Sequence, residues 1–221
     1  MMKKIYNRLK LLFRTDVLKT LYWTRRCRVS KGKHFFIYAN SIIQIADSAK
    51  LDIKKGIFEI NKSHSNSGIK RKDYCGELIL EENSYLIVEN NFSVYQGGSI
   101  YVAKNAKLVL KGNGFINTKS QIECYNYIEI GANTIISDNV RIQDSDIHHI
   151  NSADGLKKNN TDPIIIGDHV WIGLNVVILK GVTIGSGSVI GAGSVVTNNI
   201  PANSLAAGNP AVVIKKNISW E

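Results

Sequence analysis

The chain has 221 residues, 44% of them hydrophobic, and a formal net charge of +10. This length fits one domain, and the apolar fraction is high enough for a continuous core, which excludes a wholly disordered chain. The charge is uneven, because residues 1–30 hold nine Lys or Arg against Asp16 alone and so carry +8. Along the rest of the sequence no run of basic residues with interleaved aromatic residues is visible, so we do not expect nucleic-acid binding.

The three cysteines, Cys27, Cys75 and Cys124, are odd in number and widely spaced. This pattern is typical of neither a disulfide framework nor a metal-binding knuckle. We therefore expect reduced thiols in a cytoplasmic protein that needs no metal. The longest early apolar run, residues 11–13, is too short for a signal-peptide core or a membrane span.

Between Ile5 and Trp23 apolar residues recur at roughly helical spacing, and cations occupy much of the other face. We interpret residues 3–26 as one amphipathic helix, or two short ones, within a basic segment of residues 1–30. A cationic face beside Leu and Phe suits an anionic membrane surface, so peripheral membrane contact is one interpretation. The other is that the apolar face packs on the protein's own domain or on a second subunit.

From residue 31 onward the sequence becomes a repeat with a period of six residues. An aliphatic residue occupies every sixth position, and a small or β-branched residue follows four places later. Each hexad is typical of a short strand plus a corner, and coils of such hexads must stack to bury a continuous apolar column. The clearest aliphatic positions are Ile130, Ile136, Ile142, Ile166, Ile172, Ile178, Ile184, Ile190 and Val196.

Weaker hexads extend the column upstream, to a first coil at residues 42–60. The 22 Asn residues indicate frequent tight turns, because Asn tolerates the left-handed backbone region. Shifts of the six-residue frame at residues 61–76, 97–99 and 111–117 are interpreted as loops that leave the coil.

The longest interruption, residues 147–163, falls between regular hexads. A long loop inside a compact repeat is usually functional. Pro210 cannot donate the N–H that a further coil would use, so the repeat should end there. The predicted β-helix domain therefore spans residues 31–216 and includes a C-terminal cap, and residues 217–221 form a tail.

Several segments together resemble a known family: DSDIHHI at 144–150, IGDHVWIG at 166–173, ILKGVTIGSGSVIGAGSVVT at 178–197 and AAGNPAVVIK at 206–215. They resemble the hexapeptide-repeat acyltransferases, and within that family the maltose, galactoside and polysaccharide O-acetyltransferases of capsule or O-antigen type. The resemblance implies an all-β fold, a left-handed parallel β-helix, and a homotrimer. It also implies an acetyl-CoA-dependent O-acetyltransferase that acts on a hydroxyl of a sugar or of a cell-surface polysaccharide precursor.

A sugar hydroxyl is a poor nucleophile and needs a base within hydrogen-bond reach as it attacks the thioester carbonyl. In similar enzymes the catalytic histidine follows an Asp-rich stretch, which matches DSDI at 144–147. The resemblance therefore assigns His148 as the general base, with His149 as the alternative. It also implies that Asp146 or Asp144 orients the imidazole, as an acid does in other histidine-based sites.

The acceptor or thioester end of the site would include Trp171, whereas the neighbouring His169 is interpreted as a surface residue. Coenzyme A lies in similar proteins along a groove between two β-helices, against the backbone of small residues. The matching positions here are Gly173, Ala192, Thr197, Asn198 and Lys215. Similar proteins often carry Lys where this chain has Asn198, so one phosphate contact of the pattern is missing.

Other functions of the same coil fit the sequence less well. The γ-class carbonic anhydrases bind zinc with three histidines, but His148 and His169 lack the closely spaced second pair that such a site needs. A non-catalytic scaffold would not need the histidine motif. Among transferases, the alternatives are antibiotic O-acetyltransferases and nucleotide-sugar N-acetyltransferases. The basic N-terminus favours capsule or O-antigen enzymes, whose acceptors can be lipid-linked.

Overall fold

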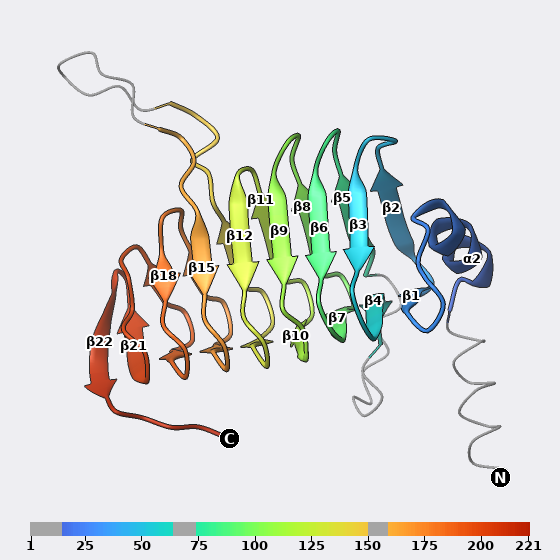
Figure 1. The fold of residues 1–221 in the computed structure, drawn as a ribbon. Coiled ribbons are helices and arrows are strands. Elements are labelled where there is room, and N and C mark those ends of the chain that lie inside the picture. Colours follow the sequence, from blue (N-terminus) through green and yellow to red (C-terminus); the bar gives the residue numbers. More distant parts are fainter. Residues whose placement is uncertain (1–14, 64–73, 150–158) are drawn as a thin grey trace, which may run out of the picture.

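The computed structural model describes residues 15–63, 74–149 and 159–221. Short strands wind these residues into a left-handed parallel β-helix, in which each of β1 to β17 pairs with the third strand after it along the chain (Figure 1). The predicted fold class is confirmed.

The strands form three sheets, one along each side of the coil. The first sheet contains β1 (His34–Ile37), β4 (Ile57–Lys62), β7 (Phe92–Tyr95), β10 (Gly114–Ile116), β13 (Ile135–Ile136), β16 (Trp171–Ile172), β19 (Val189–Ile190), β21 (Ser204–Gly208) and β22 (Ala211–Lys216). The second contains β2 (Ser41–Ile45), β5 (Gly76–Leu80), β8 (Ser99–Val102), β11 (Gln121–Cys124), β14 (Arg141–Gln143), β17 (Val177–Ile178) and β20 (Val195–Val196). The third contains β3 (Lys50–Ile53), β6 (Tyr85–Val88), β9 (Lys107–Leu110), β12 (Tyr127–Ile130), β15 (Ile164–Ile166) and β18 (Thr183–Ile184).

The interior of the coil is a column of apolar side chains. The predicted aliphatic positions from Ile130 to Val196 are all at most 1% exposed, so the six-residue pattern does mark the inward face. The position four residues later also points inward. Where it is serine, the neighbouring corner binds the hydroxyl: Ser188 Oγ donates to the carbonyl of Pro201 at 2.8 Å. A buried hydroxyl without such a partner would destabilise the column.

The coils differ in length. Strand β6 pairs with β9, which begins 22 residues later, whereas β16 pairs with β19, which begins only 18 residues later. The additional residues lengthen the strands, because β6, β7 and β8 have four residues each whereas β16, β17 and β18 have two each. At the corners, ten of the fourteen described non-Gly residues with positive φ are Asn. The loops predicted at 97–99 and 111–117 are therefore wrong, because these segments contain the start of β8 and all of β10. The first coil also begins earlier than predicted, at β1.

The glycines that directly follow the aliphatic positions do not serve to form turns. Gly167, Gly173, Gly185 and Gly191 all lack a positive φ. A Cβ atom added to Gly185 would overlap the amide nitrogen of Ala202 in the next coil. Close stacking of the coils, and not turn geometry, therefore excludes a side chain there.

Helix α2 (Val17–Arg26) begins after Asp16, whose backbone is extended at φ −73° and ψ 90°. The Asp16 carboxylate caps the helix by accepting from the Lys19 amide at 3.0 Å. The prediction of a single helix over residues 3–26 is therefore wrong, because the chain is not helical at Asp16. The first part of the two-helix alternative lies outside the described residues.

Helix α2 packs on the first coil through its polar side and Trp23. Thr20 Oγ1 donates to the carbonyl of Ile37 at 3.3 Å and accepts from the Ile37 amide at 3.0 Å. In the described part of the chain, no helix is both long and apolar enough to cross a membrane. Packing of the whole apolar face on the protein's own domain is not observed, because Leu18, Leu21 and Tyr22 are exposed on the outer side of α2, at 81%, 62% and 58%.

The C-terminal end of the column is an antiparallel hairpin of β21 and β22, whose turn contains the cis Asn209–Pro210 bond. The chain after Pro210 therefore runs back along β21 and does not begin another coil. The predicted tail is also bound to the column. The Ile218 amide donates to the carbonyl of Asn203 at 3.0 Å, and the ring of Trp220 stacks on His169 with 4.0 Å between centroids.

Ile166 and Ile165 are neighbours in β15 that point to opposite sides of the third sheet, so they form a matched pair. Ile166 is 1% exposed, and Ile166→Ala should lower the unfolding free energy by about 2–5 kcal/mol, because it leaves a cavity between coils. Ile165→Ala, on the outer side, should lower it by less than about 1 kcal/mol. Urea unfolding followed by circular dichroism measures both, and equal losses would contradict the inward-facing column.

Candidate active site

The long loop leaves the coil between β14 and β15, at the edge shared by the second and third sheets (Figure 1). Its two described arms pair at the base. Ser145 forms an antiparallel bridge with Thr161, and the Asp146 amide donates to the carbonyl of Asn160 at 2.8 Å. The base of the loop is therefore a two-stranded stalk, which we call the histidine stalk because His148 and His149 follow directly.

Asp144 lies inside the coil. Its side chain is fully buried, and its carboxylate accepts the backbone amides of Tyr125 at 2.6 Å, Asn126 at 2.8 Å and Tyr127 at 2.8 Å. Desolvation by burial raises the pKa of this carboxyl, and the three amide bonds oppose that rise. Asp144 therefore fixes a coil corner, and its carboxylate is bound to backbone amides instead of the imidazole that the resemblance implied.

Asp146 is bound to a lysine. Its Oδ2 lies 2.7 Å from Nζ of Lys180, which also donates to the carbonyl of Asn159 at 2.6 Å. Lys180 follows β17 in the next coil and its side chain is only 19% exposed. It therefore ties both arms of the histidine stalk to the column. Nothing in the sequence pattern marks Lys180, because lysine is an ordinary residue at an outward corner.

A strained turn immediately precedes His148. Ile147 has a φ of 64°, which is rare for a β-branched residue. The His148 amide donates to the carbonyl two residues earlier at 2.6 Å, the hydrogen bond of a γ-turn with positive φ. Ser145 Oγ accepts the Ile147 amide at 2.9 Å, and Asn160 Nδ2 donates to the Ile147 carbonyl at 3.3 Å. Such strain persists only where surrounding contacts hold it, and it is concentrated at functional sites.

Trp171 lies on a different sheet from the histidine stalk. It is 43% exposed in β16 of the first sheet, and its Nε1 donates to Ser137 Oγ at 3.3 Å. The ring of Trp220 lies 6.0 Å from that of Trp171 and stacks on exposed His169. The C-terminal tail thus completes an aromatic group that the sequence did not predict, because the residues are far apart in the chain.

The predicted coenzyme-A residues fall into separate groups. Gly173 and Ala192 adjoin in successive coils where the first sheet meets the second, and a Cβ on Gly173 would lie 2.8 Å from the amide nitrogen of Ala192. Coil stacking alone therefore accounts for Gly173. Exposed Thr197 and Asn198 follow β20, at the edge from which the histidine stalk leaves, and share a 3.0 Å hydrogen bond. Lys215 is exposed in β22.

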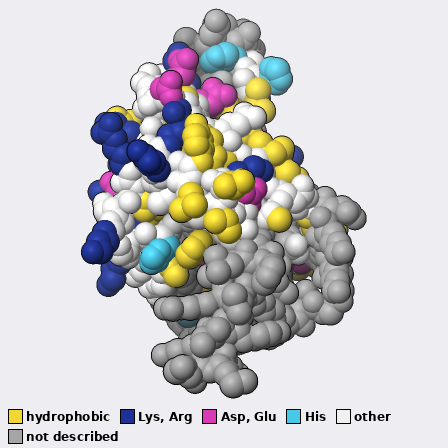
Figure 2. All heavy atoms as spheres, turned by 90° about the vertical axis from the view of Figure 1, so that its right-hand side faces the viewer, with side chains coloured by type: hydrophobic (Ala, Val, Ile, Leu, Met, Phe, Trp, Pro, Cys, Tyr) yellow, Lys and Arg dark blue, Asp and Glu magenta, His cyan; other side chains and the backbone are white. Residues whose placement is uncertain are grey.

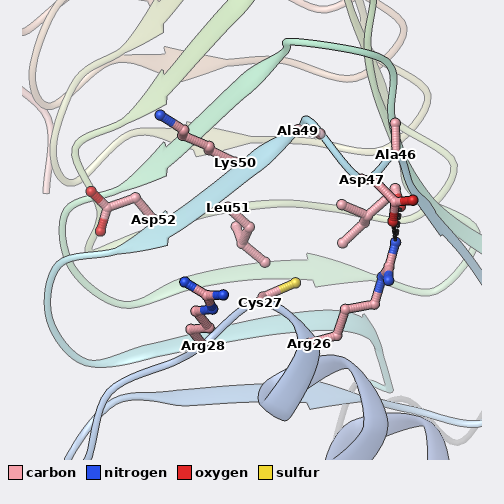
Figure 3. A pocket seen from close by; sticks show the side chains of 10 residues that line it. Arg26, Cys27, Arg28, Ala46, Asp47, Ala49, Lys50, Leu51 and Asp52 are labelled. Atoms are coloured by element: carbon pink, nitrogen blue, oxygen red, sulfur yellow. Dashed lines mark hydrogen bonds and ion pairs between the residues drawn. The ribbon is translucent and has the colours of Figure 1, made fainter.

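A cavity of about 470 Å³ lies far from the histidine stalk, between the end of α2 and β3 (Figure 3). Figure 3 shows Cys27 and Leu51 pointing toward one another there, with Arg26 paired to Asp47 at one side. Burial raises the pKa of the Cys27 thiol to about 11, so it is protonated at neutral pH and a poor nucleophile.

Among the described residues, no group of three His, Cys, Asp or Glu is arranged to hold a metal.

Asp144 and Asp146 offer a matched test of structural and chemical roles. Asp144→Asn should lower the unfolding free energy by about 1–3 kcal/mol, because an amide nitrogen would face backbone donors. Asp146→Asn should lower it by less than about 1 kcal/mol, because that carboxylate is partly exposed. Urea unfolding measures both. A fully stable but inactive Asp144→Asn would contradict the structural role.

A family model for the hexapeptide repeat of succinyl-transferase matches residues 163–198. A polysialic acid O-acetyltransferase of Escherichia coli O1:K1 / APEC is 41% identical over 127 residues, which are 56% of this chain and 41% of that protein. The chain thus matches less than half the length of that relative. Galactoside O-acetyltransferase of Escherichia coli (strain K12) is 36% identical over 194 residues, which are 86% of this chain and 87% of that one.

Two solved structures are similar as well. The polySia specific acetyltransferase NeuO has a TM-score of 0.63 and 30% identity, covering 86% of this chain and 85% of its own. A galactoside acetyltransferase in complex with coenzyme A has a TM-score of 0.50 and 34% identity, covering 61% and 66%. Because the galactoside O-acetyltransferase matches nearly the full length of both chains, the chain belongs to the hexapeptide-repeat acyltransferase family, among the sugar and polysaccharide O-acetyltransferases, and is an acyltransferase.

Proposed function

We propose that this chain transfers the acetyl group of acetyl-CoA to a hydroxyl of a sugar unit in a cell-surface polysaccharide or its precursor, with His148 as general base. The observation that carries the proposal is the strained turn at Ile147, which fixes the backbone of His148 at the rim of the histidine stalk. The names of the matched relatives, which are O-acetyltransferases of galactosides and polysialic acid, support the reaction class.

The chemistry needs one base and one oxyanion donor. The imidazole of His148 takes the hydroxyl proton while the oxygen attacks the thioester carbonyl carbon. A backbone N–H stabilises the tetrahedral oxyanion. The C–S bond then breaks and the imidazole returns the proton to the departing thiolate. No covalent enzyme intermediate is required, because the thioester is already activated.

The acetyl donor, acetyl-CoA, would lie against the separate groups of small and polar residues at the corners of the coil. Coenzyme A is bound in the similar galactoside acetyltransferase structure, which supports an acyl-CoA donor here. Ala192, Thr197 and Asn198 are exposed and present backbone and hydroxyl groups to it. Lys215 supplies a point charge for a phosphate. Gly173 contributes by letting the coils approach closely beside Ala192.

The proposed functional unit is a homotrimer. The outer side of the first sheet carries an apolar row in which Ile135, Trp171, Val189 and Leu205 are register partners in successive coils. Such a row is suited to burial against another copy of the chain. Trp171 belongs to this row, on a different sheet from the strands beside the histidine stalk of its own chain.

His148→Ala should lower kcat by roughly 10²–10⁴-fold, the usual size of the loss of a general base. Its melting temperature and its affinity for coenzyme A should not change, because His148 is exposed. Thiol release from acetyl-CoA, measured with a panel of cell-surface oligosaccharides and small sugars, tests both the base and the acceptor class.

His34→Ala is the control, because His34 is exposed in β1 and lies outside the histidine stalk. It should keep full activity. If His149→Ala abolishes turnover and His148→Ala does not, the base is the neighbouring residue. Transfer only to antibiotics or to amino groups of nucleotide sugars would overturn the proposed acceptor.

The proposed enzyme also touches an anionic membrane surface through α2. Leu18, Leu21 and Tyr22 project from its outer side, and Arg25 lies on the same short helix. Lipid-linked acceptors would be concentrated at such a surface. The basic charge of the N-terminal segment supplies attraction to anionic headgroups, worth on the order of 1 kcal/mol per cation.

The double variant Leu18→Ser/Leu21→Ser should weaken binding to anionic vesicles at least about 10-fold, because each buried leucine contributes about 1.5–3 kcal/mol. Val212→Ser/Ile214→Ser is the matched control, since these apolar side chains of β22 are similarly exposed, at 59% and 60%. Co-sedimentation at low and high salt measures both. A full-length protein that ignores anionic vesicles even at low salt would refute the membrane contact.

A further inference from the structure

A row of alternating lysines and tyrosines runs along the outer face of the third sheet. Lys50, Tyr85, Lys107 and Tyr127 are the first residues of β3, β6, β9 and β12, and each is the register partner of the next. Neighbouring strands lie about 4.8 Å apart, so the row is about 14 Å long. We call it the Lys–Tyr row.

The side chains of the row face solvent and contact one another. Lys50 Nζ lies 5.2 Å from the centroid of the Tyr85 ring, and Lys107 Nζ lies 5.8 Å from that of Tyr127. Both lysines are exposed, and Tyr85 is 40% exposed. Neither lysine forms an ion pair with another residue that the structure describes. The ammonium groups lie over the rings at distances that give a weak cation–π attraction.

Three carboxylates lie on or beside this face: Asp52, Glu129, which accepts a hydrogen bond from the Tyr127 hydroxyl at 2.6 Å, and Glu89, which directly follows β6. Asp52 pairs with Lys54, and Glu129 pairs with Lys111 at 2.7 Å. These lysines lie just beyond β3 and β9, at the opposite ends of the strands from the row. Glu129 also acts electrostatically on Lys107, but its ion pair is with Lys111, so the ammonium groups of Lys50 and Lys107 stay open to a ligand.

The face is hollowed beside the row. A cavity of about 450 Å³ adjoins a second one, the cavity of Figure 3, because Lys50 and Asp52 line both. Figure 2 looks at this end of the molecule and shows Lys and Arg side chains gathered at the left, where the third sheet lies. The first cavity is lined by Lys50, Asp52, Tyr85, Ile87 and Lys107.

The row points to the candidate active site. Ile128 pairs with Ile164, so the next position in line after Tyr127 is Pro163, the last residue of the long loop. Asp144, just before the loop, accepts a hydrogen bond from the Tyr127 amide at 2.8 Å. In Figure 1 the first residues of the third-sheet strands lie along the same upper edge from which the loop leaves.

We propose that the Lys–Tyr row binds an acidic polysaccharide chain and leads it to the histidine stalk. This inference rests on the proposed function and names its acceptor class. Lysine ammonium groups would bind the carboxylate or other acidic groups of the repeating units as point charges. The tyrosine rings between them would stack against the apolar faces of the sugar rings. A neutral chain would leave both lysines without a charged partner.

Two variants with the same charge change test the row. Lys107 and Lys119 are both exposed and both lie over a tyrosine ring, at 5.8 Å and 4.3 Å, but Lys119 is not on the third sheet. In the absence of acetyl-CoA, we would measure the binding of two acidic polymers, colominic acid and alginate, and of neutral dextran as the control. Lys107→Glu should weaken binding of an acidic polymer about 10-fold at low salt, and Lys119→Glu should not. The difference should shrink as salt rises.

The same variants then separate the two proposals. With an acidic acceptor, Lys107→Glu should raise KM about 10-fold and leave kcat unchanged. Equal binding by the two variants, or no binding of either acidic polymer by the unaltered chain, overturns the row even if acetyl transfer occurs. Binding that depends on Lys107, with no acetyl transfer to any acceptor, supports the row and overturns the proposed function. A change in oligomer mass on Lys107→Glu would assign this face to an interface between copies and overturn the row.

Discussion

Close stacking of the coils around one aliphatic column is the constraint on which the rest of the structure depends. Gly185 has no space for a Cβ against Ala202, and the inward aliphatic positions are essentially unexposed. With the coils at this spacing, side chains on the outer faces form rows whose members are one strand apart. Each coil contacts only its neighbours, so a long loop can be inserted at a corner without opening the core. The histidine stalk and the Lys–Tyr row both follow from this arrangement.

The inward face could be predicted because it obeys a fixed period, and Ile130 to Val196 lie where the period places them. The corners could not. A six-residue frame cannot distinguish a coil with longer strands from a coil interrupted by a loop, so β10 was not predicted. Helical spacing in the N-terminal segment likewise identifies an apolar side but not the side that packs. Thr20 and Trp23 pack on the coil because hydroxyl and indole groups fit its exposed end, and Leu18 points away.

The candidate site was only partly predictable for a similar reason. The motif at 144–149 places two histidines at a loop, and the structure agrees that both are exposed at its base. The motif does not reveal that Asp144 points inward while Asp146 points outward, because alternation along a short strand ends where the loop begins. The partner of Asp146 is Lys180, from the next coil, and Trp220 reaches His169 from the end of the chain. Contacts between such distant positions leave no trace in a local pattern.

The two ends of the column have a further consequence, for the fate of the protein at high concentration. A stack of parallel strands that ends in an open coil is a template on which another molecule could continue end to end and form a fibre. At one end, α2 engages the edge strand β1 through Thr20 and Asp16, whose amide donates to the carbonyl of Ile37 at 2.8 Å. At the other, β22 runs antiparallel and carries Lys215 and Lys216 on the final edge. Pairing of another molecule's strand is thereby opposed at both ends of the first sheet.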